Sequence, residues 1–143
     1  EKDRFTPEEY RLLITPSDLK VLEHANRFSD TNVLHCCGWA GIPNHLEVWR
    51  DYPAKAINWA CFVENMDLRQ GKEFFGGKCV LGGFDNRAGS LINNGTKEDI
   101  QAFARELVKQ NAQPGIMIGA DCTLPATIDP TRIQWVVDAV ANA

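Results

Sequence analysis

The sequence predicts a single α/β domain of 143 residues, built from parallel strand–helix units. Two observations predict this class. Short apolar runs typical of buried strands alternate along the chain with stretches of helical hydrophobic spacing. The composition is that of an ordinary globular protein, with 44% hydrophobic and 24% charged residues. No linker, low-complexity tract or charge block divides the chain, so one domain over residues 1–143 is expected.

Two helices are expected before the first strand. Thr6 is followed by Pro7 and two acids, a pattern typical of a helix start because the acids lie near the positive end of the helix dipole. A second helix is predicted from Ser17 to about Phe28. Its apolar face is formed by residues at helical spacing, namely Leu19, Val21, Leu22, Ala25 and Phe28.

Four strand–helix units are predicted to follow. The expected elements are strand 32–37, a short helix 44–52, strand 55–60, a helix near 67–75, strand 78–84, a helix after Thr96, strand 115–120 and a helix capped by Asp129. The buried face of the last helix is expected to contain Ile133, Val136, Val137 and Val140. Strands that alternate with helices pair in parallel, which predicts one parallel sheet covered by helices.

The first predicted strand ends in two kinds of metal ligand. Because side chains alternate between the faces of a strand, His35 and Cys37 share one face. Neutral imidazole and thiolate are usual zinc ligands, and a catalytic zinc commonly takes three protein ligands and leaves one position open. Cys122, which follows the apolar run 116–118, is the best candidate for the third ligand. The alternative is that these are ordinary buried residues, since free cysteine is among the most buried types.

Polar or reactive residues follow all four predicted strands. The carboxyl ends of parallel strands meet at one edge, where α/β proteins build their sites. Asp85 and Asp121 are therefore candidate catalytic residues, although Asp85 could instead belong to a solvated turn. Glu64 is interpreted as an exposed acid at a helix start rather than as a zinc ligand. Trp39 and Trp59 could form an apolar wall near the site, although core packing is commoner for tryptophan.

Charge and cysteine content exclude several classes of protein. The net charge is −4 without a clustered basic face, which argues against a nucleic-acid partner. No apolar run is long enough to span a membrane, and no signal peptide is visible. The five cysteines lack the spacing of a disulfide scaffold, which favours reduced thiols and the cytoplasm. The chain begins at Glu1 without a methionine, which suggests a processed product or a piece of a longer protein.

Five short motifs share their pattern with one known superfamily. They are residues 34–38 (LHCCG), 57–59 (INW), 80–85 (VLGGFD), 94–96 (NGT) and 119–122 (GADC) followed by Pro125. In these motifs, from about residue 17 onward, the chain resembles the C-terminal half of the uroporphyrinogen decarboxylase superfamily. Members of that superfamily have a (β/α)8 barrel. The resemblance therefore implies that the four strand–helix units are half of a TIM-type barrel.

The resemblance implies one of two chemistries. Uroporphyrinogen decarboxylases, enzymes of tetrapyrrole biosynthesis, need no metal, and their main catalytic aspartate and arginine lie in the N-terminal half. The methylcobamide:coenzyme M methyltransferases carry a His-x-Cys and a later Cys that bind zinc, and His35, Cys37 and Cys122 match this pattern. The pattern favours a zinc-dependent methyltransferase that activates a thiol to accept a methyl group. Some relatives add a glutamate after the next strand, for which Asn58 and Glu64 are the nearest options.

The expected partners follow from this resemblance. A methyl-corrinoid protein would be the methyl donor, and a small thiol would be the acceptor. The alternatives are a uroporphyrinogen decarboxylase and a non-catalytic half-barrel that binds a metal or a partner. A half-barrel exposes two sheet edges and an apolar inner face, so self-association or a separate N-terminal half is expected.

Overall fold

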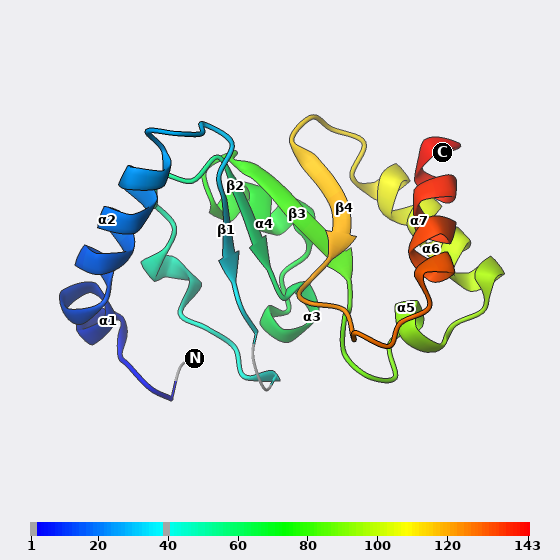
Figure 1. Cartoon of the computed structure of the whole chain (residues 1–143), viewed down its shortest axis with the longest axis horizontal. Helices are drawn as coiled ribbons and strands as arrows, with labels where there is room; N and C mark the ends of the chain where they lie inside the picture. Colours follow the sequence, from blue (N-terminus) through cyan, green and yellow to red (C-terminus); the bar gives the residue numbers. More distant parts are fainter. Residues whose placement is uncertain (1–2, 39–40) are drawn as a thin grey trace.

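Four parallel strands form one sheet in the computed structural model, which describes residues 3–38 and 41–143 (Figure 1). The strands are β1 (Val33–Cys36), β2 (Ala56–Trp59), β3 (Cys79–Phe84) and β4 (Ile116–Ala120), and they lie in the order in which they occur in the sequence. All three pairings are parallel. The predicted α/β class and all four predicted strands are confirmed, with bounds within one residue of those expected.

Two of the described helices precede β1, one follows β4, and the others lie between consecutive strands. The helices are α1 (Pro7–Leu13), α2 (Thr15–Ala25), the 3-10 helix η2 (Leu46–Val48), α3 (Cys61–Glu64), α4 (Leu68–Phe74), α5 (Leu91–Asn94), α6 (Lys97–Gln110) and α7 (Pro130–Ala141). The predicted caps are confirmed, because the side chains of Thr6, Thr96 and Asp129 each accept a backbone N–H of the first turn. Within the described residues, no helix is long and apolar enough to cross a membrane.

One predicted helix is wrong, and two short helices were not predicted. The helix expected over residues 44–52 is only the three-residue η2, because the chain bends at Trp49 and turns at residues 50–51. Helices α3 and α5 contain four residues each. A single turn is too short to show helical periodicity, so neither helix could be predicted from the spacing of its apolar residues.

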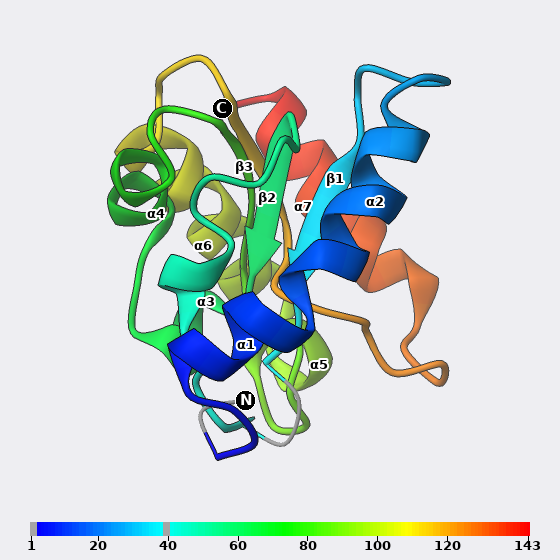
Figure 2. The same cartoon turned by 90° about the vertical axis from the view of Figure 1, so that its left-hand side faces the viewer.

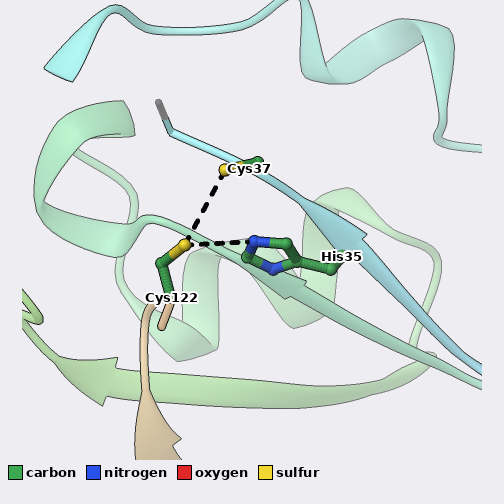
Figure 3. Close-up of side chains that lie close together, drawn as sticks. All are labelled: His35, Cys37 and Cys122. Carbon is green, nitrogen blue, oxygen red and sulfur yellow. Dashed lines mark hydrogen bonds between the residues drawn. The ribbon is translucent and has the colours of Figure 1, made fainter. Parts of the chain in front are cut away.

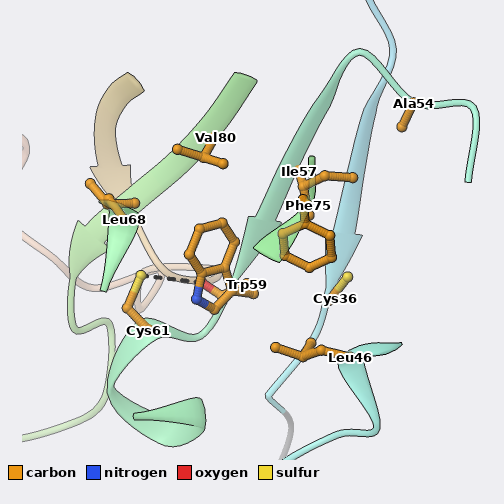
Figure 4. Packing of buried hydrophobic residues seen from close by; sticks show 9 residues of the cluster. All are labelled: Cys36, Leu46, Ala54, Ile57, Trp59, Cys61, Leu68, Phe75 and Val80. Carbon is orange, nitrogen blue, oxygen red and sulfur yellow. Dashed lines mark hydrogen bonds between the residues drawn. The ribbon is translucent and has the colours of Figure 1, made fainter. Parts of the chain in front are cut away.

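The two faces of the sheet have different surroundings. Cys36, Ile57, Trp59 and Val80 belong to the main apolar cluster, together with Leu68 of α4 and other buried residues (Figure 4). Helices α4 and α6 lie on the same side of the sheet (Figure 2). Strand register places His35 opposite Asn58, Asn58 opposite Leu81, and Leu81 opposite Met117, so these four residues share the other face. That face carries the candidate metal ligand His35.

Trp59 belongs to the core rather than to a wall of the site. Its side chain is fully buried, packs against Phe75, and donates its indole N–H to the carbonyl oxygen of Met66 at 3.0 Å (Figure 4). Trp59 follows Asn58 in β2 and therefore lies on the opposite face of the sheet. The core-packing alternative is thus correct for Trp59. Trp39, the other tryptophan of the predicted wall, lies outside the described residues.

The predicted apolar faces of α2 and α7 are only partly buried. Leu22 of α2 packs against the main cluster, but Val21 is exposed. The predicted end of this helix at about Phe28 is wrong, because α2 ends at Ala25 and Phe28 lies in the turn that follows, with 80% of its surface exposed. In α7, Val136 and Val140 pack against a second cluster, whereas Ile133 and Val137 are exposed, Val137 at 52%. Helix α2 lies on the β1 side of the sheet and α7 on the β4 side (Figure 1). The predicted burial of these helix faces is therefore wrong for the apolar residues that do not pack against the sheet or its clusters.

Substitution of Gly71 by alanine tests the packing around Trp59. An added Cβ at Gly71 in α4 would lie 2.1 Å from the Cη2 and Cζ2 atoms of the Trp59 ring. Glycine to alanine in a helix ordinarily stabilises a protein by about 0.5–1 kcal/mol. Here we expect Gly71→Ala to lower the free energy of unfolding by about 1–3 kcal/mol, because the core must shift to admit the methyl group. Urea denaturation measures this change.

The control for this substitution is Glu73→Ala in the same helix. Glu73 is exposed, so its replacement should change the free energy of unfolding by at most about 0.5 kcal/mol. A Gly71→Ala variant as stable as the wild type would contradict the described packing.

Candidate metal centre

The candidate ligands come from the two outer strands of the sheet. His35 lies in β1, and Cys37 immediately follows that strand, whereas Cys122 lies two residues after the end of β4. Since the strands are parallel, both segments leave the sheet at the edge formed by the carboxyl ends of the strands. Figure 3 shows the three side chains pointing toward one another across this edge.

The distances between the three side chains suit a common metal ion. The Nε2 atom of His35 lies 3.3 Å from Sγ of Cys122, and the Sγ atoms of Cys37 and Cys122 are 3.7 Å apart (Figure 3). One potential ligand atom from each residue lies within 4.8 Å of the others. Ligands at about 2.0–2.3 Å from a tetrahedral zinc lie about 3.3–3.8 Å from one another. The structure thus brings all three predicted ligands together.

The chemistry of this group also fits zinc. Two thiolates and one imidazole nitrogen form a ligand set that zinc favours, and three protein ligands leave a fourth position open. Cys37 and Cys122 are not joined by a disulfide bond, so each can present a thiol sulfur to a metal ion. His35 and Cys37 are exposed and Cys122 is half-buried, so an ion and a further small ligand have access to the group.

Asn58 lies beside this group, on β2. Its side chain is buried, with 7% exposed, and its Oδ1 atom contacts Nδ1 of His35. The Nδ2 atom donates to the carbonyl oxygens of Leu81, at 2.8 Å, and Ala120, at 3.3 Å. The sequence suggested Asn58 only as one of the two nearest options for the glutamate that some relatives place after the next strand. Its contact with His35 was missed, although paired register of the first two predicted strands could have indicated it.

Glu64 lies outside the group of candidate ligands and is half-buried rather than exposed. Its Oε1 atom accepts hydrogen bonds from the backbone N–H and the side-chain amide of Asn44, at 2.9 and 3.0 Å. The same amide donates to the carbonyl oxygen of Cys37 at 2.9 Å. Glu64 thus positions the backbone of a candidate ligand through Asn44. Sequence reasoning did not find this role, because only the tertiary structure brings the loop containing Asn44 next to α3.

Asp121 is the most deeply buried acid at this edge of the sheet, with 1% exposed. Its Oδ1 accepts the backbone N–H of Gly83 at 2.8 Å, and its Oδ2 accepts that of Phe62 at 3.2 Å. Burial raises the pKa of this carboxyl group above its usual value, although both backbone hydrogen bonds oppose the shift. Asp121 therefore ties β3 and α3 to the residue that precedes Cys122. Its predicted catalytic role stays a prediction.

Asp85 follows β3 and pairs with Arg87. The guanidinium group makes a bidentate contact, with Nη2 2.7 Å from Oδ2 and Nε 2.9 Å from Oδ1. These hydrogen bonds from Arg87 are the main cause of a lowered pKa of Asp85. Asp85 is thus kept ionised at the same edge of the sheet as the three candidate ligands. Its predicted catalytic role also stays a prediction.

A family model described as uroporphyrinogen decarboxylase (URO-D) matches residues 2–143 of this chain. The chain belongs to the URO-D family. The resemblance drawn from the motifs is thereby confirmed, and the family has a TIM-barrel fold. The four parallel strands of the URO-D chain are consistent with half of such a barrel. No curated protein matches the chain.

The two aspartates are expected to give pH dependences of opposite sign. The pKa of Asp85 is lowered from 3.8, so its ion pair stabilises the fold above that pH and loses its effect as the pH falls through the folded-state pKa. The pKa of Asp121 is raised from 3.8, so its ionisation destabilises the fold as the pH rises through the folded-state pKa. For each aspartate, the direction of the pH dependence follows from comparing the stability of the wild type with that of the variant in which this aspartate is replaced by asparagine.

The measurement is urea denaturation of the wild type, Asp85→Asn and Asp121→Asn at several acid pH values. As the pH falls, the stability advantage of the wild type should shrink relative to Asp85→Asn and grow relative to Asp121→Asn. Near neutral pH, Asp121→Asn should still cost about 1–3 kcal/mol, because an amide cannot accept both backbone N–H groups. If the stability advantage of the wild type changed in the same direction with pH relative to both variants, the described environments of the two aspartates would be contradicted.

Proposed function

We propose that this URO-D chain is the C-terminal half of a zinc-dependent methyltransferase, which activates a thiol to accept a methyl group from a corrinoid. The observation that carries the proposal is the meeting of His35, Cys37 and Cys122 at one edge of the sheet. Uroporphyrinogen decarboxylases need no metal, so they do not require such a group. The zinc-binding methyltransferases of the superfamily carry this ligand pattern.

His35, Cys37 and Cys122 would hold the zinc ion. When bound, zinc would supply the positive charge that favours the thiolate form of an incoming thiol near neutral pH. The exposure of His35 and Cys37 leaves room for a small thiol and for a bulky methyl donor. In the transfer, the thiolate sulfur would form a bond to the methyl carbon while the cobalt–carbon bond breaks and leaves its electron pair on the corrinoid cobalt.

The two aspartates would support this reaction from the same edge. Asp85 is proposed to orient the substrate, because its carboxylate stays ionised beside Arg87 at the end of β3. Asp121 is proposed to hold the chain that presents Cys122, because it is anchored to two backbone N–H groups. A cytoplasmic location is proposed as well, because five cysteines without the spacing of a disulfide scaffold favour a reducing compartment.

Metal content tests this proposal directly. The chain purified under reducing conditions without added metal is expected to contain about one zinc per chain, measured by elemental mass spectrometry. Cys37→Ser and Cys122→Ser should each lose most of this zinc, because each removes one of the three ligands. Cys79→Ser is the control, since Cys79 is a half-buried thiol outside the ligand group.

Metal-free wild-type protein would contradict the methyltransferase proposal. It would favour the decarboxylase alternative, in which the other half of the barrel supplies the catalytic residues, or a non-catalytic half-barrel. Zinc retained in both ligand variants would show that the metal binds elsewhere.

The proposal includes a partner that completes the barrel, either an N-terminal half or a second copy of this chain. Strands β1 and β4 lie at the edges of the sheet, and each pairs with only one other described strand. Exposed apolar side chains lie on α1 and α2, on the open face of the sheet, and on α7: Leu12, Leu13, Val21, Val33, Met117, Ile133 and Val137. In a complete barrel, further strand–helix units would cover the sheet edges and these side chains.

Sedimentation of the chain alone tests this expectation. We expect self-association that increases with protein concentration, because burial of apolar surface drives pairing. Met117→Lys and Val137→Lys should weaken it, whereas Glu98→Lys on the exposed side of α6 should not. A stable dispersed monomer would contradict the expected pairing.

A further inference from the structure

The amide of Asn58 has only one orientation that satisfies its neighbours. Its Nδ2 atom lies 2.8 Å from the carbonyl oxygen of Leu81 and 3.3 Å from that of Ala120. Carbonyl oxygens can only accept hydrogen bonds, so the NH2 group must face β3 and β4. The oxygen of the amide is thereby turned toward β1, where it contacts Nδ1 of His35.

This orientation determines which nitrogen of His35 carries the proton. An amide oxygen can only accept a hydrogen bond, so Nδ1 of His35 must be the donor. A neutral imidazole has a single N–H, so a proton on Nδ1 leaves the lone pair on Nε2. Nε2 is the ring nitrogen that lies 3.3 Å from Sγ of Cys122 (Figure 3). The free lone pair therefore faces the two thiols.

We propose that Asn58 is a positioning residue that selects the Nδ1–H tautomer of His35 and holds its Nε2 ready to bind a metal. Asn58 acts through His35 and not as a fourth ligand, because its oxygen contacts the ring nitrogen other than the one that faces Cys122. Hydrogen-bond partners of this kind fix the tautomer and ring orientation of metal-binding histidines. The metal-binding part of the inference rests on the proposed function, whereas the tautomer does not.

Asparagine is the residue type that these contacts require. The position needs one acceptor for Nδ1 of His35 and two N–H groups for carbonyl oxygens on two different strands. Aspartate would keep the acceptor but would place a carboxylate oxygen against those carbonyls. Leucine would fill a similar volume with neither function. The two variants therefore separate the acceptor from the rest of the side chain.

The first test is the tautomer of His35 in the metal-free wild type. Long-range 1H–15N NMR spectra at about pH 8, where imidazole is neutral, distinguish the two tautomers. The chain contains only three histidines, so His24 and His45 serve as internal references. We expect His35 to carry its proton on Nδ1. A proton on Nε2 would overturn the inference, and this outcome depends neither on a variant that folds nor on the binding of zinc.

The second test compares zinc affinity and tautomer in three variants, with a chromophoric chelator as competitor. Asn58→Leu should weaken zinc binding by about 10–100-fold and release His35 to adopt the Nε2–H tautomer. Asn58→Asp should keep the Nδ1–H tautomer, because it retains the acceptor. The control is Asn93→Leu, since Asn93 also donates to two carbonyl oxygens, those of Asn86 and Arg87.

Three outcomes are decisive. Unchanged zinc affinity and tautomer in Asn58→Leu would overturn the proposed role of Asn58. An equal loss of affinity in Asn93→Leu would show that general destabilisation explains the effect, which would also overturn it. If the wild type binds no zinc, the proposed function fails, and the NMR measurement still decides whether Asn58 selects the tautomer of His35.

Discussion

The parallel pairing of four strands is the constraint on which the candidate site depends. Parallel strands all end at the same edge of a sheet, so the residues that follow β1 and β4 come close although 85 positions separate Cys37 from Cys122. An antiparallel arrangement of the outer strands would place these residues at opposite edges. The short apolar strands thus determine the fold and also bring the imidazole and the two thiols together.

Buried polar side chains hold the segments that carry the candidate ligands. Asn58 connects β1 to the carbonyl oxygens of β3 and β4, and Asp121 connects the end of β4 to backbone N–H groups of β3 and α3. Buried Asn44, together with half-buried Glu64, does the same for the backbone of Cys37. Buried groups of this kind are costly unless their hydrogen bonds are satisfied. Their presence at this edge indicates that the site is preorganised by its supporting residues.

Parts of the sheet and its flanking helices expose apolar side chains that further elements of a barrel would cover. Apolar side chains remain exposed on α2, α7 and the face of the sheet that carries His35, while the opposite face is closed by α4 and the main apolar cluster. This asymmetry is consistent with half of a TIM barrel, the fold of the URO-D family, in which the open face would correspond to the barrel interior. The group of candidate ligands would then lie at the rim of that interior, where barrel enzymes place their chemistry.

Much of this protein could be predicted from local sequence patterns. Apolar runs predicted all four strands, capping residues such as Thr6 and Asp129 predicted helix starts, and the alternation of side chains in a strand placed His35 and Cys37 together. These features depend on residues close in sequence, and local physical preferences determine them. The single-turn helices α3 and α5 were missed because four residues carry no measurable period.

Only the tertiary structure decided what each polar residue contacts. The sequence could not reveal that the amide of Asn58 donates to carbonyl oxygens of β3 and β4, that Glu64 binds Asn44, or that both oxygens of Asp121 bind backbone N–H groups. Nor could it show that Val137 and Phe28 remain exposed, because helical spacing identifies an apolar face but not the neighbour that covers it. The physical reason is that these contacts join residues distant in sequence, so they depend on strand register and on packing between elements.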